Sequence, residues 1–325
     1  MKIRNILFFA SSLLMVACAT KPQQPELANE VGPYTVDAII PNVYHIQDYN
    51  TANPVGESFD ENGEKTHFNN CSDMYLVVGS EKALLIDLSN YVKWDSTAVE
   101  SLQKVVADRI GNLPLTITFT HNHDDHTGML PAFIDNPEVM FALPRIDFEA
   151  YADKVAESRR NLYDAGEKFE LGGITISTLL VPGHTHGSIV FFVDGKNILL
   201  SGDAIGSGHG VWIFNREGFD EYVAAVPALI SYIENPANGI DKDALQIYGG
   251  HYWQKDWLEL PEGRELGMEY ILDMQELINQ IGEGSAYSEP SNLAHPVLDT
   301  YFRLNNSIIV WNLEQAGEYA AEKRQ

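Results

Sequence analysis

The sequence predicts a mixed α/β fold, and two observations carry this prediction. Short apolar runs of strand type alternate along the chain with longer amphipathic stretches of helical spacing, which is typical of sheets covered by helices. The 325 residues include 45% hydrophobic and 21% charged residues, a composition expected of a globular domain that can bury a sizeable core.

The expected strands combine apolar or alternating side chains with flanking turn residues such as Gly and Asn. We expect them at residues 34–46, 74–78, 82–87, 115–120 and 301–311, with three or four more within 169–200. The expected helices place apolar side chains three or four positions apart. We expect them at residues 96–109, 145–165, 219–234 and 262–281 and in the last dozen residues.

The N-terminal segment has the composition of a secretory signal, because a basic start precedes an apolar run too short to span a bilayer. Leu-Met-Val-Ala-Cys at 14–18 resembles a bacterial lipobox, in which Cys18 would be lipidated; ordinary cleavage at the Ala-Cys-Ala site is the alternative. We therefore expect a signal peptide at 1–17, a polar tether at 18–33 and one domain over 34–325. The corresponding location is the bacterial cell envelope, lipid-anchored through Cys18, or the periplasm or the medium.

Residues 121–126 read His-Asn-His-Asp-Asp-His and follow an apolar run of strand type. Side chains two positions apart on an extended segment point the same way, so His121 and His123 can converge on one metal ion. Asp125 and His126 fall where the chain should turn into a helix and can approach a second ion. Imidazole and carboxylate ligands together suit zinc and similar first-row metals.

Three further candidate ligands each follow a strand-like segment. His184 stands in Pro-Gly-His-Thr, Asp203 in Ser-Gly-Asp and His251 in Gly-Gly-His. The glycines allow the backbone to turn sharply and to approach a small, crowded site.

These four motifs, in this order, resemble the metallo-β-lactamase superfamily of binuclear metal hydrolases, and the resemblance extends over residues 36–255. The resemblance implies a four-layered αβ/βα sandwich, in which two mixed sheets pack face to face, helices cover the outside and the metals lie along one edge. Periodicity alone would indicate only the α/β class.

The resemblance also implies two divalent metal ions, with zinc as the first expectation and iron or manganese as alternatives. The implied ligands are His121, His123 and His184 for one ion, Asp125, His126 and His251 for the other, and Asp203 as the bridge. The ions would share a hydroxide that attacks a carbonyl or phosphoryl centre. Asp125 or a metal-bound water would protonate the leaving group, and Asp125 and Asp203 are the expected catalytic carboxylates.

The identity of residue 203 separates branches of the superfamily. Zinc β-lactamases normally have Cys or Ser at this position, so Asp203 points away from antibiotic hydrolysis and toward the branch of glyoxalase II, lactonases and phosphodiesterases. That match is incomplete, because Gly206 stands where such lactonases have Tyr. We expect hydrolysis of an ester, lactone, thioester or amide. The alternatives are a phosphodiesterase, a mononuclear iron enzyme similar to persulfide dioxygenases, and a non-catalytic binding lipoprotein.

The formal net charge of −25 indicates which partners are disfavoured. Such a chain repels nucleic acid and anionic membrane surfaces, so we expect a small-molecule substrate and no nucleic acid. The oligomeric state is not predicted.

Several residues near the motifs have two readings. Asp87 could hydrogen-bond a ligand histidine or cap its own turn, and His186 could orient a ligand or lie on the surface. The long polar stretch at 49–70 could overhang the metals or be a solvated insertion. A group of aromatic side chains could line an apolar pocket or fill the core. These aromatic residues are Trp212, Phe214, Tyr252 and Trp253.

Overall fold

The computed structural model of the protein describes residues 27–48, 57–59, 65–67, 72–207, 210–251, 265–291, 293 and 295–325. The expected signal peptide, Cys18, Tyr252 and Trp253 lie outside the described residues. Among the described residues, no helix combines the length and the apolar composition of a membrane span.

The first sheet contains eight strands in the order β1-β2-β3-β6-β7-β8-β9-β10. Neighbours are antiparallel from β1 to β7 and parallel from β7 to β10, where the helix α1 (Ala98–Ile110) forms the crossover between β7 and β8. The strands are β1 (Glu30–Val31), β2 (Tyr34–Ile40), β3 (Val43–Gln47), β6 (Asp73–Val78), β7 (Ala83–Ile86), β8 (Leu115–Thr118), β9 (Met140–Pro144) and β10 (Arg160–Tyr163).

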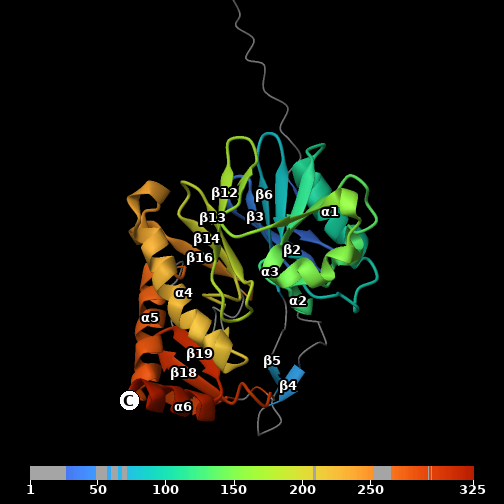
Figure 1. The fold of residues 1–325 in the computed structure, drawn as a ribbon. Helices are drawn as coiled ribbons and strands as arrows, with labels where there is room; N and C mark the ends of the chain where they lie inside the picture. Colours follow the sequence, from blue (N-terminus) through green and yellow to red (C-terminus); the bar gives the residue numbers. More distant parts are fainter. Residues whose placement is uncertain are drawn as a thin grey trace, which may run out of the picture.

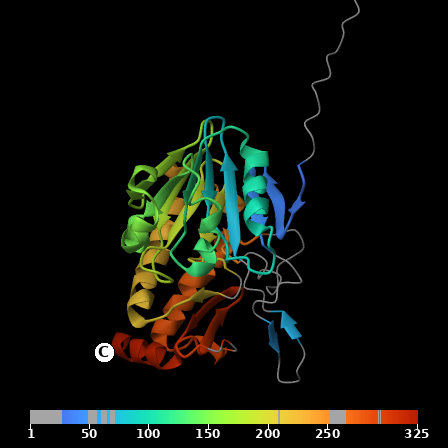
Figure 2. The ribbon, with the colours of Figure 1, turned by 90° about the vertical axis from the view of Figure 1, so that its right-hand side faces the viewer.

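The second sheet contains five strands in the order β11-β12-β13-β14-β16, and only the last pair is parallel. Its strands are β11 (Lys168–Glu170), β12 (Thr175–Leu180), β13 (Ile189–Val193), β14 (Ile198–Gly202) and β16 (Gln246–Gly249). The helices α4 (Arg216–Glu234) and α5 (Met268–Glu283) cover its outer face, and α1 covers the outer face of the first sheet (Figures 1 and 2). The four-layered sandwich is therefore confirmed.

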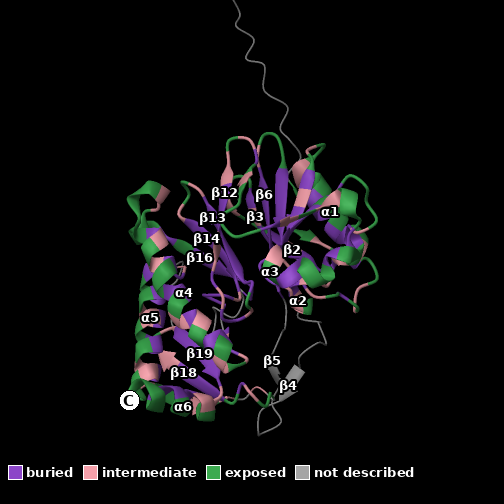
Figure 3. Cartoon of the chain, in the orientation of Figure 1, coloured by how far each residue is buried: buried purple, intermediate pink, exposed green. Residues whose placement is uncertain are grey.

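The central strands β6, β7, β13 and β14 are buried on both faces, as Figure 3 shows for the centre of the molecule. In β7, Leu84 and Ile86 face the second sheet, whereas Ala83 and Leu85 face α1. Phe191 of β13 enters the same inter-sheet core from the other side. Strands that are apolar on both faces can form only inner layers, because neither face can be left in water.

A third sheet was not expected. It has the order β15-β19-β18-β17, and its hydrogen bonds join the chain after Asp203 to the C-terminal part of the chain. Its strands are β15 (Val211–Trp212), β17 (Tyr287–Pro290), β18 (Thr300–Leu304) and β19 (Ser307–Trp311). The expected strand at 301–311 is therefore a hairpin, which turns at Asn305 with φ of +52°. The helix α6 (Leu313–Lys323) follows it.

Four other segments differ from the sequence prediction. Residues 34–46 form the hairpin β2–β3, which turns at Asn42 with φ of +71°. The expected helix at 145–165 is only α3 (Arg145–Phe148) followed by 3-10 turns, because β10 pairs with β9 and tertiary pairing overrides local spacing. Within the expected loop 49–70, β4 (Glu57–Phe59) pairs with β5 (Lys65–His67). In the range expected to be a tether, β1 pairs with β2.

Replacing a leucine in the inter-sheet core should destabilise the protein strongly. Leu84→Ala removes a side chain with 0% exposure and leaves a cavity between two rigid sheets, so the free energy of unfolding should fall by about 2–5 kcal/mol. Leu272→Ala, on the outer side of α5 with 48% exposure, is the matched control and should change it by less than about 0.5 kcal/mol. Urea unfolding followed by circular dichroism measures both; equal losses would contradict the layer assignment.

Candidate metal centre

The seven predicted ligands come from both sheets and meet at one edge of the sandwich. His121 and His123 follow β8, and Asp125 and His126 belong to the short helix α2 (Asp124–Thr127). The second sheet contributes the other three from the chain after β12, β14 and β16, and these ligands are His184, Asp203 and His251. The structure brings together every predicted ligand.

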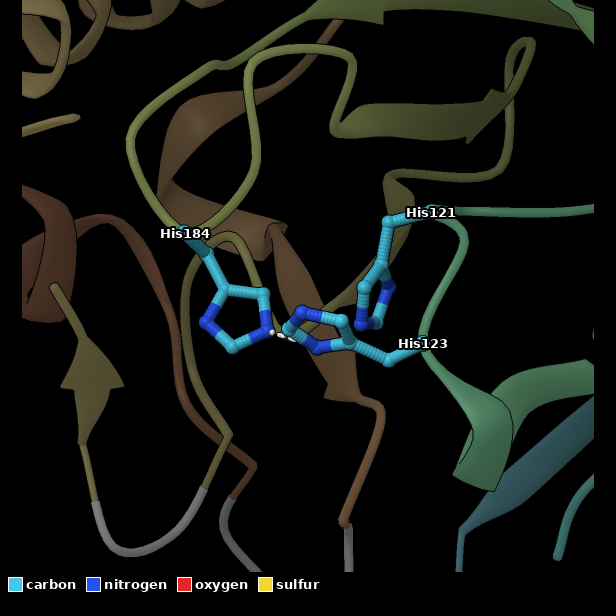
Figure 4. Close-up of side chains that lie close together, drawn as sticks. All are labelled: His121, His123 and His184. Carbon is cyan, nitrogen blue, oxygen red and sulfur yellow. Dashed lines mark hydrogen bonds between the residues drawn. The ribbon is translucent and has the colours of Figure 1, made fainter. Parts of the chain in front are cut away.

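The first group consists of His121, His123 and His184, whose ligand nitrogens lie within 4.8 Å of one another. The three imidazoles point toward a common space in Figure 4, where His121 and His123 approach from one segment and His184 from another. The closest pair is His184 Nε2 and His123 Nδ1, at 2.9 Å. Three imidazole nitrogens converging in this way form a face suited to one metal ion.

The second group contains His126, Asp203 and His251, again with ligand atoms within 4.8 Å. Asp125 adjoins it, since its Oδ2 lies 3.4 Å from His251 Nε2. Asp203 stands between the two groups. Its Oδ1 lies 3.5 Å from His126 Nε2, and its Oδ2 lies 3.5 Å from His184 Nε2 and 3.3 Å from His251 Nε2. One carboxylate therefore reaches imidazoles of both groups.

The polar atoms of the cluster fit bound metal ions. The Nε2 atoms of His121 and His126 are buried and have no hydrogen-bond partner among the described residues. Burying a polar atom without a partner costs free energy, so native structures rarely leave two in one place. Imidazole nitrogens and carboxylate oxygens at these positions are the donor set expected for zinc and related ions.

For His121, His126 and His184, the ring nitrogen that faces away from the centre is held by a neighbour. Asp87 Oδ2 lies 2.9 Å from His126 Nδ1, which confirms the predicted role of Asp87. Asp87 also accepts hydrogen bonds from the amide and hydroxyl of Thr120, and that hydroxyl lies 3.0 Å from His121 Nδ1. The carbonyl of Trp212 accepts from His184 Nδ1 at 2.9 Å. Such contacts orient the rings and leave Nε2 facing the centre.

Burial and charge divide the histidines into two classes. Burial lowers the pKa of His121 and His123 and brings the pKa of His184 to about 4, so these rings are neutral at neutral pH. For His126 and His251 burial acts in the same direction, but the nearby carboxylates, Asp203 first, outweigh it and raise the pKa well above its usual value.

The two expected catalytic carboxylates are ionised. Burial acts to raise the pKa of Asp125 and Asp203, but His126 and His251 outweigh it and hold both pKa values below the ordinary range. Asp125 therefore begins as a proton acceptor rather than as an acid.

Glycine is required beside Asp203 because no side chain fits there. A Cβ on Gly250 would lie 2.3 Å from Asp203 Oδ1 and 2.7 Å from His126 Cε1. Gly202 precedes Asp203 with φ of +50°, and a Cβ there would lie 2.5 Å from Thr120. The glycines in the Ser-Gly-Asp and Gly-Gly-His motifs thus allow the close approach that the sequence indicated.

Not every candidate joins the centre. His186 is half exposed and pairs with Glu221 on α4 at 2.8 Å, so the surface reading holds. The ring of Phe214 lies beside the cluster, with centroids 5.6 Å from His123 and 5.5 Å from His184. Trp212 contributes its carbonyl, as described above, and its ring packs with the residues of the third sheet.

Sequence reasoning missed Thr120, Asp147 and Ser207. Asp147 accepts hydrogen bonds from Thr185 Oγ1 and from the amide of Gly187, which fixes the loop that carries His184. Ser207 Oγ donates to Asp203 Oδ1 at 3.2 Å. Thr120 and Ser207 lie next to or near the motifs in the sequence, and this closeness could have indicated their role. Asp147 lies far from every motif in the sequence, so no sequence pattern indicated its role.

A family model matches the chain over residues 72–234, and it describes the Metallo-beta-lactamase superfamily. An atrochrysone carboxyl ACP thioesterase of Claviceps purpurea is 24% identical over 182 residues, which cover 55% of this chain and 50% of that protein. The lactamase-like protein vrtG of Penicillium aethiopicum is 29% identical over 157 residues, which cover 48% of this chain and 46% of that protein. The chain thus spans about half the length of these curated relatives.

Solved structures agree with the fold. A metallo-beta-lactamase from Pontibacter korlensis has a TM-score of 0.52 at 16% identity, with 76% of this chain and 99% of that chain covered. The metallo-beta-lactamase FIM-1 from Pseudomonas aeruginosa, in its mono-zinc form, has a TM-score of 0.51 at 18% identity, with 78% and 98% covered.

Zinc binding to the metal-free protein should release protons at pH 7. His126 and His251 have raised pKa values and are protonated there, whereas an imidazole that binds a metal through its ring nitrogen is neutral. The apparent zinc affinity should therefore rise with pH through the range in which these groups titrate. Calorimetric titration at one pH in two buffers of different ionisation enthalpy gives the proton count. Identical heats in both buffers would contradict the assignment.

Gly250→Ala should disrupt metal binding while the fold is kept, because the added methyl group displaces Asp203 and His126. We expect zinc affinity to fall by at least about 10-fold, in the range seen when ligands are misoriented. The control is Gly317→Ala on α6, where the new Cβ meets nothing within 4 Å. The control should keep its zinc affinity and its circular dichroism spectrum. Retained zinc affinity in Gly250→Ala would show that the segment adapts.

Proposed function

Because the chain belongs to the metallo-beta-lactamase superfamily, we propose that it is a metal-dependent hydrolase that uses two divalent ions to cleave an ester, lactone, thioester or amide in a small molecule. The observation that carries the proposal is the position of Asp203, which reaches imidazoles of both ligand groups within 3.5 Å. A carboxylate between two sets of ligands has the arrangement expected of a bridge between two ions.

We assign the ligands of each ion as the family resemblance implies. His121, His123 and His184 would hold one ion, Asp125, His126 and His251 would hold the other, and Asp203 would contact both. Ions in such a site lower the pKa of bound water from 15.7 to about 7 and polarise the carbonyl oxygen under attack. The donor set favours zinc, with iron or manganese as alternatives.

The protein's own groups have separate tasks. Asp87, Thr120 and the Trp212 carbonyl hold the imidazoles in the tautomer and orientation that ligation requires. The ionised carboxylate of Asp125 accepts the proton of the attacking water and returns it to the leaving group. This cycle needs no serine or cysteine nucleophile, because water attacks the carbonyl directly.

The net charge of the chain and the aromatic side chain beside the centre favour a carbonyl substrate over a phosphodiester. The chain has a net charge of −25, which disfavours the approach of an anionic phosphodiester. Phe214 adds an apolar wall beside the first histidine group. The thioesterase among the relatives supports the same class. Together with Asp203, these features support our proposal of a substrate nearer to those of glyoxalase II and the lactonases than to β-lactams.

The test is a panel of acyl thioesters, lactones, nitrophenyl esters, β-lactams and a nitrophenyl phosphodiester, assayed with zinc and after chelation. Chelation should abolish turnover, and Asp203→Asn should lower kcat by at least about 100-fold, because changes in outer-shell contacts alone cost 10- to 100-fold. Asp243→Asn, at an exposed carboxylate, is the matched control and should keep full activity.

This panel, together with elemental analysis of the protein and an oxygen-uptake assay with a persulfide, separates the alternatives. Full activity in excess chelator, with no retained metal, overturns the proposal. Preference for the phosphodiester favours nuclease-like or phosphodiesterase chemistry. A single iron per chain and oxygen uptake with a persulfide favour a dioxygenase.

A further inference from the structure

The candidate centre spans the join between two sheets, so its geometry depends on how the sheets are fixed to one another. His121, His123, Asp125 and His126 belong to the first sheet, whereas His251 follows β16 of the second. The apolar core between the sheets holds them together without directional preference. Placing His251 against Asp125 and Asp203 requires contacts that also define direction.

Two hydrogen bonds from β6 of the first sheet reach the backbone in front of His251. The hydroxyl of Tyr75 donates to the carbonyl of Gly249 at 2.6 Å, and the amide of Asp73 donates to the carbonyl of Gly250 at 2.8 Å. From its own sheet, Gly250 donates its amide to Gly202 at 2.8 Å. The two glycines before His251 are thus clamped between the sheets.

This clamp compensates for the freedom of glycine. Position 250 must be glycine, because a Cβ would overlap Asp203, yet two consecutive glycines form a backbone with little conformational preference of its own. The glycines therefore leave space for Asp203 but make the backbone less rigid. External hydrogen bonds can restore the rigidity, and a buried hydrogen bond has no competing water.

Tyr75 is itself held by buried neighbours. Its ring, with 1% exposure, stacks on His45 with centroids 5.4 Å apart and an interplanar angle of 20°. The Nε2 atom of His45 lies 2.7 Å from Asp73 Oδ1, and Gln47 donates to the same oxygen at 2.9 Å. Because β3 pairs with β6 in a register that places His45 opposite Tyr75, the group forms one unit.

We propose that Tyr75 is a positioning residue for His251, and that the unit of His45, Asp73 and Tyr75 sets the affinity of the ion that His251 binds. The inference rests on the two-ion function proposed above. Tyr75 acts by fixing the Gly249 carbonyl, and through that carbonyl it positions the imidazole of His251.

The experiment is stepwise Co²⁺ titration of Tyr75→Phe, followed by visible absorption and by competition with a chelating dye. Loss of the hydroxyl should weaken one of the two binding steps by about 10- to 100-fold and leave the other unchanged. His251→Ala identifies which step reports on His251, and Tyr75→Phe must affect that same step. Asp73→Asn, which keeps the backbone donor to Gly250, should have a smaller effect.

The matched control is Tyr163→Phe, because Tyr163 is also buried and its hydroxyl lies 3.0 Å from Thr118 Oγ1 rather than at the centre. It should lose comparable stability and keep both binding steps. Equal weakening of both steps in Tyr75→Phe, or the same weakening in Tyr163→Phe, overturns the positioning role. Wild-type protein that binds fewer than two ions overturns the two-ion function and this inference with it. Two ions in the wild type and unchanged affinities in Tyr75→Phe overturn the inference alone.

Discussion

The attraction between the Asp203 carboxylate and the imidazoles around it is the interaction on which the centre depends. His126, His184 and His251 all lie within 3.5 Å of its oxygens, although each comes from a different stretch of chain. Without opposite charge, burying so many polar groups in one place would be unfavourable. The same attraction lowers the pKa of Asp203 and raises the pKa of His251.

The residues around Asp203 allow these groups to approach without steric overlap and hold them in place. Glycine at 202 and 250 provides room, and Asp87, Asp147 and Tyr75 restore order to the segments that the glycines and turns leave loose. All three side chains are buried. Asp87 and Asp147 each make more than one hydrogen bond, and Tyr75 donates to a backbone carbonyl. The site is therefore as much a product of its supporting contacts as of its ligands.

The sequence was sufficient for the cluster of seven candidate ligands, because His-x-His at a strand end and Asp or His after glycine are short local patterns. Periodicity alone indicated only the α/β class, and the four layers were expected from the family resemblance. The sequence was insufficient where pairing partners are distant. The spacing of residues 160–163 predicted a helix, but these residues form β10 because they pair with β9. The third sheet pairs residue 211 with residue 309. Asp147 contacts the His184 loop from another element.

The pairing of β15 with β19 has a consequence for how the protein matures. Trp212, whose carbonyl orients His184, pairs with Val310 of β19. All seven ligands precede β19 in the chain and are therefore synthesised before it. We therefore expect the His184 ring to reach its final orientation only after β19 has been synthesised and has paired with β15.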